Sequence, residues 1–286
     1  MLKPIAESEL LINPDGSIYH LGLKPGEVAE KIIAVGDPGR VERISSHFDR
    51  IEVKRTHREY VTHTGIFKGK PLSVMSTGMG TDNVEIFLTE LDALFNIDFK
   101  DRIPRNNLKR LEILRVGTSG SMQDDLPIDG ILAAEYAIGL DTLMNYYDLP
   151  QTEREKNFLR ELVKMTSLKF TPYIAKGSTA LLDRMGKNLF SGITVTCPGF
   201  FAPQGRRVRL APKLPQLLEQ LSSMKFEGRR VTNFEMETAG YYALCQLLGH
   251  DVLSLNLLIA NRKKGLFSKN AEQAMDEMIT FVLMNF

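Results

Sequence analysis

The sequence predicts a single α/β domain built around a largely parallel or mixed sheet. Short β-rich apolar segments alternate with helical patterns along the chain, and the early ones end at a glycine-rich segment. A length of 286 residues suits one large α/β domain or two modest ones, and 43% hydrophobic with 25% charged residues is typical of globular proteins. Because the alternation continues without a repeat or a low-complexity linker, we expect one domain.

Three strands in the first half of the chain each lead into glycines. Residues 31–48 predict a strand, then Gly-Asp-Pro-Gly, then a helix, and residues 71–95 repeat this plan. The second helix has one apolar face, made of Val84, Phe87, Leu88, Leu91 and Leu94. Residues 111–122, "LEILRVGTSGSM", predict a third strand with a glycine-rich exit.

The second half of the chain continues the alternation. The apolar runs 130–138, 170–178, 193–199 and 251–260 predict strands, and the periodic segments 151–167, 233–249 and 271–286 predict helices. We expect the basic stretch 99–110 to be a solvated surface excursion and residues 1–17 to form a loosely packed arm ahead of a domain that spans 18–286.

The charge balance and the cysteines exclude several classes of protein. Lys plus Arg is 36 and Asp plus Glu is 35, so we expect neither nucleic acid nor an anionic membrane as a partner, and any bound anion to be small. Cys197 and Cys245 lack CxxC spacing, which disfavours a disulfide scaffold and a zinc site. No secretory signal or membrane-length apolar run is seen, so we expect a reduced cytoplasmic compartment.

Arg115 interrupts the apolar run of the third strand. A buried guanidinium needs a partner, so either Arg115 reaches the surface or an anion lies at the end of this strand. The turns "VGDPGR", "STGMGTDN" and "VGTSG" could direct main-chain N–H groups at phosphate oxygens, together with Arg40 and Thr118. Alternatively, these glycines only close βα turns. Neither a Walker A loop nor GxGxxG is present, so a dinucleotide-binding protein is disfavoured.

A carboxylate lies on the apolar face of the predicted helix 233–249. At helical spacing, Glu237 shares that face with Tyr241 and Cys245, whereas Glu235 faces elsewhere. The hydroxyls of a sugar could satisfy Glu237, and an internal salt bridge is an equal alternative.

The loop "CPGFFAPQGRR" combines aromatic and polar side chains. Gln204 and Arg206 could read the edge of a heterocyclic amide while Phe200 or Phe201 packs on its face. The alternative is an ordinary surface loop.

Eight segments carry a family resemblance through their order along the chain: "HLGL", "VGDPGRVERI", "HREY", "STGMG", "LRVGTSGSM", "PQGRR", "NFEMETAG" and "ANR". Together they resemble the nucleoside phosphorylase family, most closely its uridine-cleaving members. The resemblance covers nearly the whole chain. It implies a three-layer α/β/α fold around a mixed, distorted, barrel-like sheet, with active sites built by pairs of subunits in a hexamer. It also implies a nucleoside as substrate, inorganic phosphate as co-substrate, and neither a metal nor another cofactor.

The resemblance implies a role for each matched residue. Phosphate would contact Gly36, Arg40, Arg115 and Thr118, with Arg58 reaching it from a neighbouring subunit. Ribose would contact Thr118, Met236, Glu237 and, across the interface, His20. The base would contact Phe200, Gln204, Arg206 and Arg262. The catalytic residues would be Arg206, Gln204, Glu237 and Arg115.

Departures from the family pattern leave alternatives open. Some relatives bind a monovalent cation at the dimer interface through a serine and the Glu of "HRE"; Glu59 is present here but Asn83 replaces the serine, which disfavours that cation. Purine-specific relatives carry an acid after the late strand, where this chain reads "IANRKKG". Pyrimidine cleavage is therefore favoured over a purine phosphorylase. Three candidate phosphate arginines disfavour a nucleosidase, and the lack of a disabling replacement among the expected ligand contacts disfavours an inactive nucleoside-binding relative. The choice between uridine, thymidine and deoxyuridine stays open.

Overall fold

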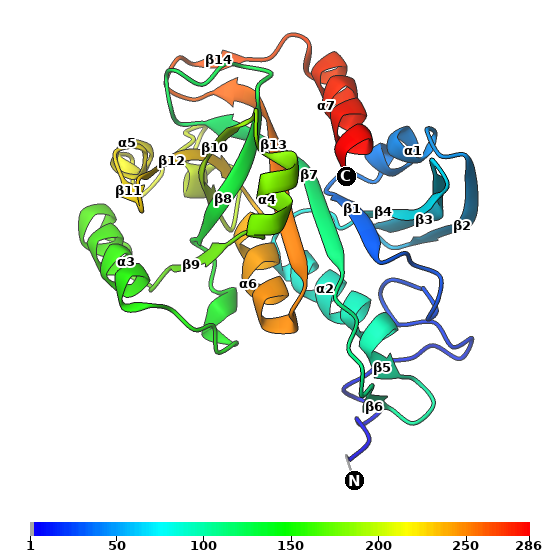
Figure 1. Ribbon diagram of the computed structural model, residues 1–286. Coiled ribbons are helices and arrows are strands. Elements are labelled where there is room, and N and C mark those ends of the chain that lie inside the picture. The colour runs from blue at the N-terminus through cyan, green and yellow to red at the C-terminus, as the bar shows by residue number, and fades with distance from the viewer. Residues whose placement is uncertain (1–2) are drawn as a thin grey trace. The chain divides into compact units, whose positions relative to one another are not determined.

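The computed structural model describes residues 3–286 and forms two compact units (Figure 1). The N-terminal unit contains the residues up to Met79, Asn83–Ile113 and Leu248–Asp251, and the C-terminal unit contains Gly80–Asp82, Leu114–Leu247 and Val252–Phe286. None of the helices within residues 3–286 is both long enough and apolar enough to cross a lipid bilayer.

A four-stranded sheet forms the centre of the N-terminal unit. Its strands are β1 (Lys31–Val35), β4 (Lys70–Ser76), β3 (Tyr60–Phe67) and β2 (Arg50–His57), in that spatial order. The β1–β4 pair is parallel and the other two pairs are antiparallel. Helix α1 (Gly39–Ser45) packs against β3 and β4, and α2 (Thr81–Asn96) buries its predicted apolar face completely.

The segments at 5–10 and 97–104 of this unit contact one another. The short strands β5 (Ile97–Asp98) and β6 (Ile103–Pro104) form a small antiparallel pair inside the basic stretch. From the turn between them, the Arg102 guanidinium donates hydrogen bonds to the carbonyl oxygens of Ile5, Ala6 and Leu10. These bonds attach the N-terminal segment 5–10 to the basic stretch 99–110. Residues 1 and 2 of the predicted arm lie outside the described residues.

The C-terminal unit is built on a closed ring of strands. Its members are β7 (Glu112–Ser121), β13 (Asp251–Asn261), β8 (Ile131–Gly139), β10 (Phe190–Thr196) and β12 (Arg229–Glu235), and β12 pairs back onto β7. The β8–β10 and β10–β12 pairs are parallel, whereas β8–β13 and β12–β7 are antiparallel. Register shifts at Gly192–Thr194 distort the ring. The predicted mixed α/β fold with a barrel-like sheet is therefore confirmed.

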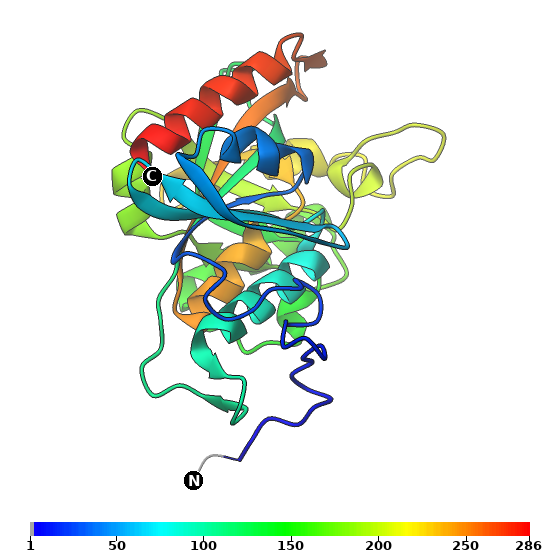
Figure 2. The ribbon, with the colours of Figure 1, turned by 90° about the vertical axis from the view of Figure 1, so that its right-hand side faces the viewer.

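Shorter elements surround this ring. They are η1 (Leu143–Asn145), α3 (Glu153–Thr166), β9 (Tyr173–Lys176), α4 (Thr179–Met185), η2 (Ala202–Gln204), α5 (Leu217–Ser222), β11 (Lys225–Phe226), α6 (Thr238–Leu248), β14 (Leu266–Phe267) and α7 (Ala271–Asn285). A capping box of Thr152 and Glu155 starts α3, because each side chain accepts a main-chain N–H of the other residue. The segment between η2 and α5 is a long loop that extends away from the strands of its unit (Figure 2).

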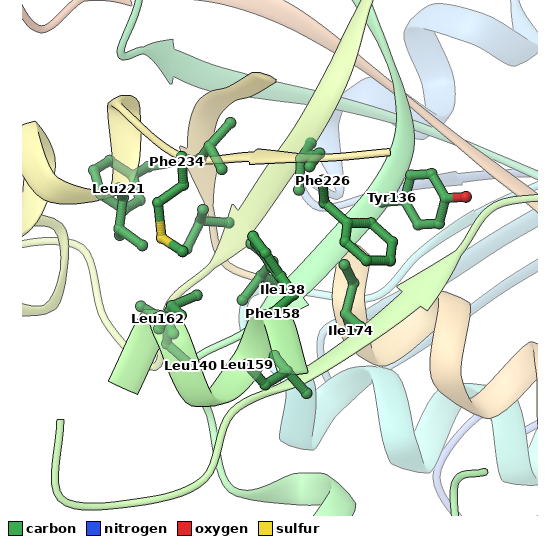
Figure 3. Packing of buried hydrophobic residues seen from close by; sticks show 14 of the residues in the cluster. Tyr136, Ile138, Leu140, Phe158, Leu159, Leu162, Ile174, Leu221, Phe226 and Phe234 are labelled. Carbon is green, nitrogen blue, oxygen red and sulfur yellow. The ribbon is translucent and has the colours of Figure 1, made fainter. Parts of the chain in front are cut away.

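An apolar core joins α3 and α5 to the strands of the ring. Figure 3 shows Phe158 and Leu162 of α3 facing Ile138 and Phe226. The ring of Phe226 packs against Phe158 at 5.0 Å and edge-on against Tyr136 at 5.3 Å between centroids. Burial of large side chains from elements far apart in sequence fixes how these helices lie on the sheet.

Two sequence predictions about the elements are wrong. The segment 233–249 is not one helix, because residues 233–235 complete β12 and α6 begins only at Thr238. The "GTSG" segment is not a turn, because β7 continues through it to Ser121. The sequence prediction also omitted β2, β3, β5, β6, β11, β14, the first part of β12, α4 and α5.

Candidate active site

Arg115 is buried inside the C-terminal unit, where it is only 4% exposed. Its Nη1 donates to Ser254 Oγ and Asn256 Oδ1, both at 3.1 Å. Its Nη2 donates to Glu237 Oε2 at 2.5 Å and lies 3.1 Å from Glu235 Oε2. Burial alone disfavours the charged guanidinium, but the two carboxylates outweigh it and raise the pKa of Arg115. The guanidinium is therefore a fixed cation within the ring of strands.

A glycine provides the space for this guanidinium. Arg115 and Gly117 lie on the same side of β7, and a methyl group on Gly117 would lie 2.3 Å from Arg115 Nη1. Further along the strand, a methyl group on Gly120 would lie 3.2 Å from Cγ of Arg262. These two glycines of β7 leave room for the side chains of two arginines.

Glu237 lies between the end of β12 and the start of α6 and is 6% exposed. Its Oε1 accepts a hydrogen bond from the Gly80 main-chain N–H at 2.8 Å, and its Oε2 accepts from Arg115. Burial raises the pKa of the Glu237 carboxyl, and Arg115 offsets part of that effect. The internal salt bridge considered from the sequence is present, and each carboxylate oxygen keeps a second lone pair.

Glu235 is a functional candidate that the sequence analysis missed. Its Oε2 accepts from the main-chain N–H groups of Glu237 and Thr238, at 3.0 and 2.9 Å, and from Thr238 Oγ1 at 2.8 Å. Its Oε1 accepts from Thr196 Oγ1 at 2.5 Å. Alternation along β12 would have found it, because residues 233 and 235 of a strand share a face. The helical interpretation turned Glu235 outward instead.

The loop 197–206 brings together the residues predicted to bind a base. η2 ends at Gly205 (φ 71°), and Arg206 folds back so that its Nη1 donates to Phe200 O at 2.6 Å and to Gln204 Oε1. Arg262 Nη1 donates to Gln204 O at 3.0 Å. The Arg206 guanidinium carbon lies 3.7 Å from the centroid of the Phe200 ring. One face of that ring is therefore covered by Arg206.

Arg206 and Arg262 form a cationic pair. Within the described part of the chain, no carboxylate lies within ion-pair distance of either guanidinium. Burial, with a smaller contribution from Arg262, lowers the pKa of Arg206 to about 10, and burial also lowers the pKa of Arg262. Both side chains stay charged at neutral pH, so this loop presents a positive potential that an anionic ligand would satisfy.

The remaining predicted residues of the C-terminal unit are less enclosed. Thr118 on β7 and Met236 after β12 are both half-buried. Asn261, the asparagine of the segment "IANRKKG", is by contrast enclosed and only 2% exposed. Its side-chain amide donates to the carbonyl oxygens of Gln123 and Leu126, at 3.0 and 3.2 Å. Both N–H groups of the Asn261 amide therefore bond to main-chain carbonyl oxygens.

Other predicted residues lie in the N-terminal unit. Gly36 follows β1, and a methyl group on it would lie 3.3 Å from Gly78 O, so the "VGDPG" and "STGMG" segments pass close together. Arg40 is half-buried near the start of α1. Arg58 is exposed at a β2–β3 turn with φ 55°, and its guanidinium lies 5.4 Å from the centroid of the Tyr19 ring.

His20, next to Tyr19, contacts Glu90 and His57 of the N-terminal unit. Its Nδ1 lies 2.7 Å from Glu90 Oε1, and its carbonyl oxygen lies 2.8 Å from His57 Nδ1. The predicted residues His20 and Arg58 are therefore brought to one face of the N-terminal unit through Tyr19 and His57. Nearby, a methyl group on Gly78 would meet Asn83 Nδ2 at 2.6 Å and Glu59 Cγ at 3.3 Å, so both residues discussed for a cation lie next to that glycine.

Comparisons with known proteins identify the family to which this chain is similar. Residues 30–283 match the model of the phosphorylase superfamily. A uridine phosphorylase of Thermococcus kodakarensis is 31% identical over 274 residues, covering 96% of this chain and 88% of that protein. A DeoD-type purine nucleoside phosphorylase of Colwellia psychrerythraea is 24% identical and covers 92% of this chain and 97% of that protein. The crystal structure of a Trypanosoma brucei nucleoside phosphorylase, described as showing uridine phosphorylase activity, superposes with a TM-score of 0.86 at 31% identity and covers 97% of this chain and all of that one.

Proposed function

The chain belongs to the phosphorylase superfamily and is a pentosyltransferase of the nucleoside phosphorylase type, and on that premise we propose that it cleaves uridine with phosphate. The products are uracil and ribose 1-phosphate. The relatives include both uridine and purine nucleoside phosphorylases, so the base must be argued from the site itself.

The observation that carries the choice of a pyrimidine is the cationic pair beside Gln204. As the glycosidic bond lengthens, negative charge grows on the departing base. Arg206 and Arg262 are charged and lack carboxylate partners in the described chain, so they stabilise that charge without first giving up an ion pair. The Gln204 side-chain oxygen accepts from Arg206, which leaves its amide N–H groups for a ring carbonyl.

A purine would need a different arrangement. Protonation of a departing purine ring requires an acid near the base, and Asn261 offers an amide whose donors already serve main-chain carbonyls. Absence of that acid favours uracil, whose charge two arginines stabilise directly.

In the proposed reaction, a phosphate oxygen attacks C1′ while the C1′–N1 bond breaks and its electrons move to the base. The sugar passes through an oxocarbenium-like state, and the proton lost by phosphate reaches the base through solvent. Glu237 accepts hydrogen bonds from the ribose hydroxyls and so holds C1′ in place. The Arg115 Nη atoms already donate to protein acceptors, so its Nε is the donor left for phosphate. The phosphate contacts of Gly36, Arg40, Arg58 and Thr118 and the ribose contact of Met236 stay predictions.

Release of uracil from uridine by the purified protein, with and without inorganic phosphate, tests this function. We expect uracil only when phosphate is present, and little hypoxanthine from inosine. Thymidine and deoxyuridine, assayed alongside, define the accepted base and sugar. Hypoxanthine formed faster than uracil would refute the pyrimidine proposal, and uracil release without phosphate would indicate a nucleosidase.

The family resemblance also leads us to propose a homo-oligomer in which His20 and Arg58 complete the site of a partner subunit. Mixing a His20→Ala variant with a Glu237→Ala variant tests this sharing of sites. Active mixed dimers should form because one of the two sites would contain neither substitution. If the mixture is no more active than its components after subunit exchange, each site is built by one chain alone.

A further inference from the structure

The Glu235 carboxylate contacts both parts of the machinery that the proposed reaction uses. Its Oε2 lies 3.1 Å from Arg115 Nη2 and accepts the Glu237 main-chain N–H at 3.0 Å. The Arg115 side chain and the Glu237 main chain are thus attached to one oxygen atom. Since Glu237 also bonds to Arg115, the three residues form a closed triangle.

Further bonds fix the Glu235 side chain itself. Thr196 at the end of β10 donates to Oε1, and the Thr196 hydroxyl in turn accepts the Ala239 main-chain N–H at 2.8 Å. Thr238 donates both its main-chain N–H and its hydroxyl to Oε2. The carboxylate therefore ties the ends of β10 and β12 to the first turn of α6, and it has little freedom to move.

Simple neutralisation of Arg115 does not require this second carboxylate. Glu237 alone already pairs with the guanidinium at 2.5 Å, and a second buried negative charge beside one cation is costly unless it is well bonded. The bonds of Glu235 run mainly to the groups that set where Arg115 and Glu237 lie. Beyond serving as a counter-ion of Arg115, Glu235 therefore holds these groups in place through its other bonds.

We propose that Glu235 is a positioning residue for the phosphorolysis, holding the Arg115 guanidinium and the Glu237 carboxylate in the relative geometry that the reaction needs. This inference rests on the proposed function, and it adds a residue that contacts no substrate. Its role depends on where its oxygens lie rather than on its charge. That distinction can be tested, because glutamine preserves the position and aspartate preserves the charge.

Glu235→Gln keeps an oxygen for the donors of Thr238 and Glu237, and its amide can donate to Thr196. Glu235→Asp keeps the charge but is one methylene shorter, so it cannot reach all of these groups. We expect Glu235→Asp and Glu235→Ala to lower kcat by about 100-fold, the scale of a misplacement near 1 Å. Glu235→Gln should keep kcat within about tenfold of the wild type.

Glu135→Ala is the matched control. Glu135 is a carboxylate of β8 with 9% exposure that pairs with Arg229 at 2.5 Å, away from the groups above. The Glu135→Ala variant should lose thermal stability while keeping kcat within about twofold of the wild type. All variants are assayed well below their melting temperatures. If Glu235→Asp is more active than Glu235→Gln, charge outweighs position and the proposal is wrong.

A crystal structure of Glu235→Asp provides a readout that does not depend on turnover. We expect the Arg115 guanidinium or the Glu237 carboxylate to move relative to the wild type. If both stay in place, the positioning role is refuted even where kcat falls. If the wild-type protein shows no phosphorolysis at all, the proposed function fails, and this structure alone still decides whether Glu235 positions Arg115.

Discussion

Arg115 Nη2 lies 2.5 Å from Glu237 Oε2, inside a ring of strands where both side chains are less than a tenth exposed. An arginine in an apolar strand and a carboxylate facing inward looked like separate anomalies in the sequence, and each proves to be a partner of the other. The pair joins β7 to the start of α6. It also places a cation and a carboxylate side by side, which suits a reaction between an anion and a polyhydroxylated sugar.

Arg115→Met should be among the most destabilising substitutions in the chain. It would leave Glu235 and Glu237 as two buried carboxylates without their cation, and removal of one member of a buried ion pair costs about 3–5 kcal/mol. Urea unfolding at pH 7 measures the loss. Arg110→Met is the control, because the Arg110 side chain that pairs with Asp251 is 69% exposed, and this substitution should cost under about 1 kcal/mol. Equal losses in both variants would contradict the structural role of Arg115.

Gly117→Ala should displace the Arg115 guanidinium without replacing any charged residue. The added methyl would lie 2.3 Å from Nη1, closer than real contacts allow, so the guanidinium must move and its four bonds must distort. Overpacking of this kind costs about 1–3 kcal/mol, and kcat should fall with it. Gly120→Ala is the comparison, because its methyl meets only the flexible stem of Arg262 at 3.2 Å and should disturb stability less. Thermal unfolding of the two variants provides the ranking.

Arg206→Ala should abolish most turnover while leaving the fold intact. Loss of one preorganised donor to a developing anion costs about 3–4 kcal/mol in the transition state, equivalent to a fall of two to three orders of magnitude in kcat on uridine. Arg207→Ala removes a neighbouring arginine that is exposed and should leave kcat unchanged. Near-normal turnover in Arg206→Ala would show that the loop 197–206 does not bind the base.

Much of this architecture could be predicted from the sequence. Apolar runs punctuated by glycines located most strands of the C-terminal ring, and a lone charge in such a run identified Arg115. Glu235 was missed for a physical reason. The segment "NFEMETAG" fits a helical period, and pairing of β12 with β10 and β7 decides that its first three residues form a strand. That pairing is a tertiary effect that local periodicity does not contain.

The glycines of β7 were misread in a similar way. A local view assigns "GTSG" to a turn, because glycine usually marks one. In the structure, the space that Gly117 leaves is filled by the side chain two residues earlier, and the space at Gly120 by Arg262 from the far end of the chain. Only the folded arrangement reveals which side chains need that room.

His63 should make stability fall as the solution becomes acidic. It is 7% exposed, its Nδ1 lies 2.7 Å from Ser45 Oγ, and burial, aided by Lys54, lowers its pKa. The unfolded chain therefore takes up a proton below about pH 6.5 that the folded chain resists, so stability present above that pH is lost as the pH falls. Urea unfolding between pH 5 and 8 should show a slope that His63→Gln reduces. His47→Gln, at an exposed position, should keep the wild-type slope.

Asp141 should make stability fall as the pH rises, the opposite of the effect of His63. It is 4% exposed and accepts hydrogen bonds from Leu143 N–H at 2.9 Å and from the Tyr173 hydroxyl, yet burial still raises its pKa. A carboxyl whose pKa is higher in the folded state stabilises the protein below its unfolded pKa, and that stability is lost as the pH rises through the folded value. At neutral pH the ionised Asp141 carboxylate therefore destabilises the folded state.

Asp141→Asn removes this buried charge while keeping an oxygen that accepts from the Leu143 N–H and the Tyr173 hydroxyl. We expect the variant to be more stable than the wild type at pH 7 and the difference to shrink as the pH falls and the wild-type carboxyl becomes neutral. Asp125→Asn is the control, because its pair with Arg230 lowers the pKa of an exposed carboxyl, and the change should be slightly destabilising at pH 7. Urea titrations at pH 7 and at acidic pH measure both variants. If Asp141→Asn is destabilising at pH 7, the charge of Asp141 has a favourable partner in the fold, and the sign derived from its burial is wrong.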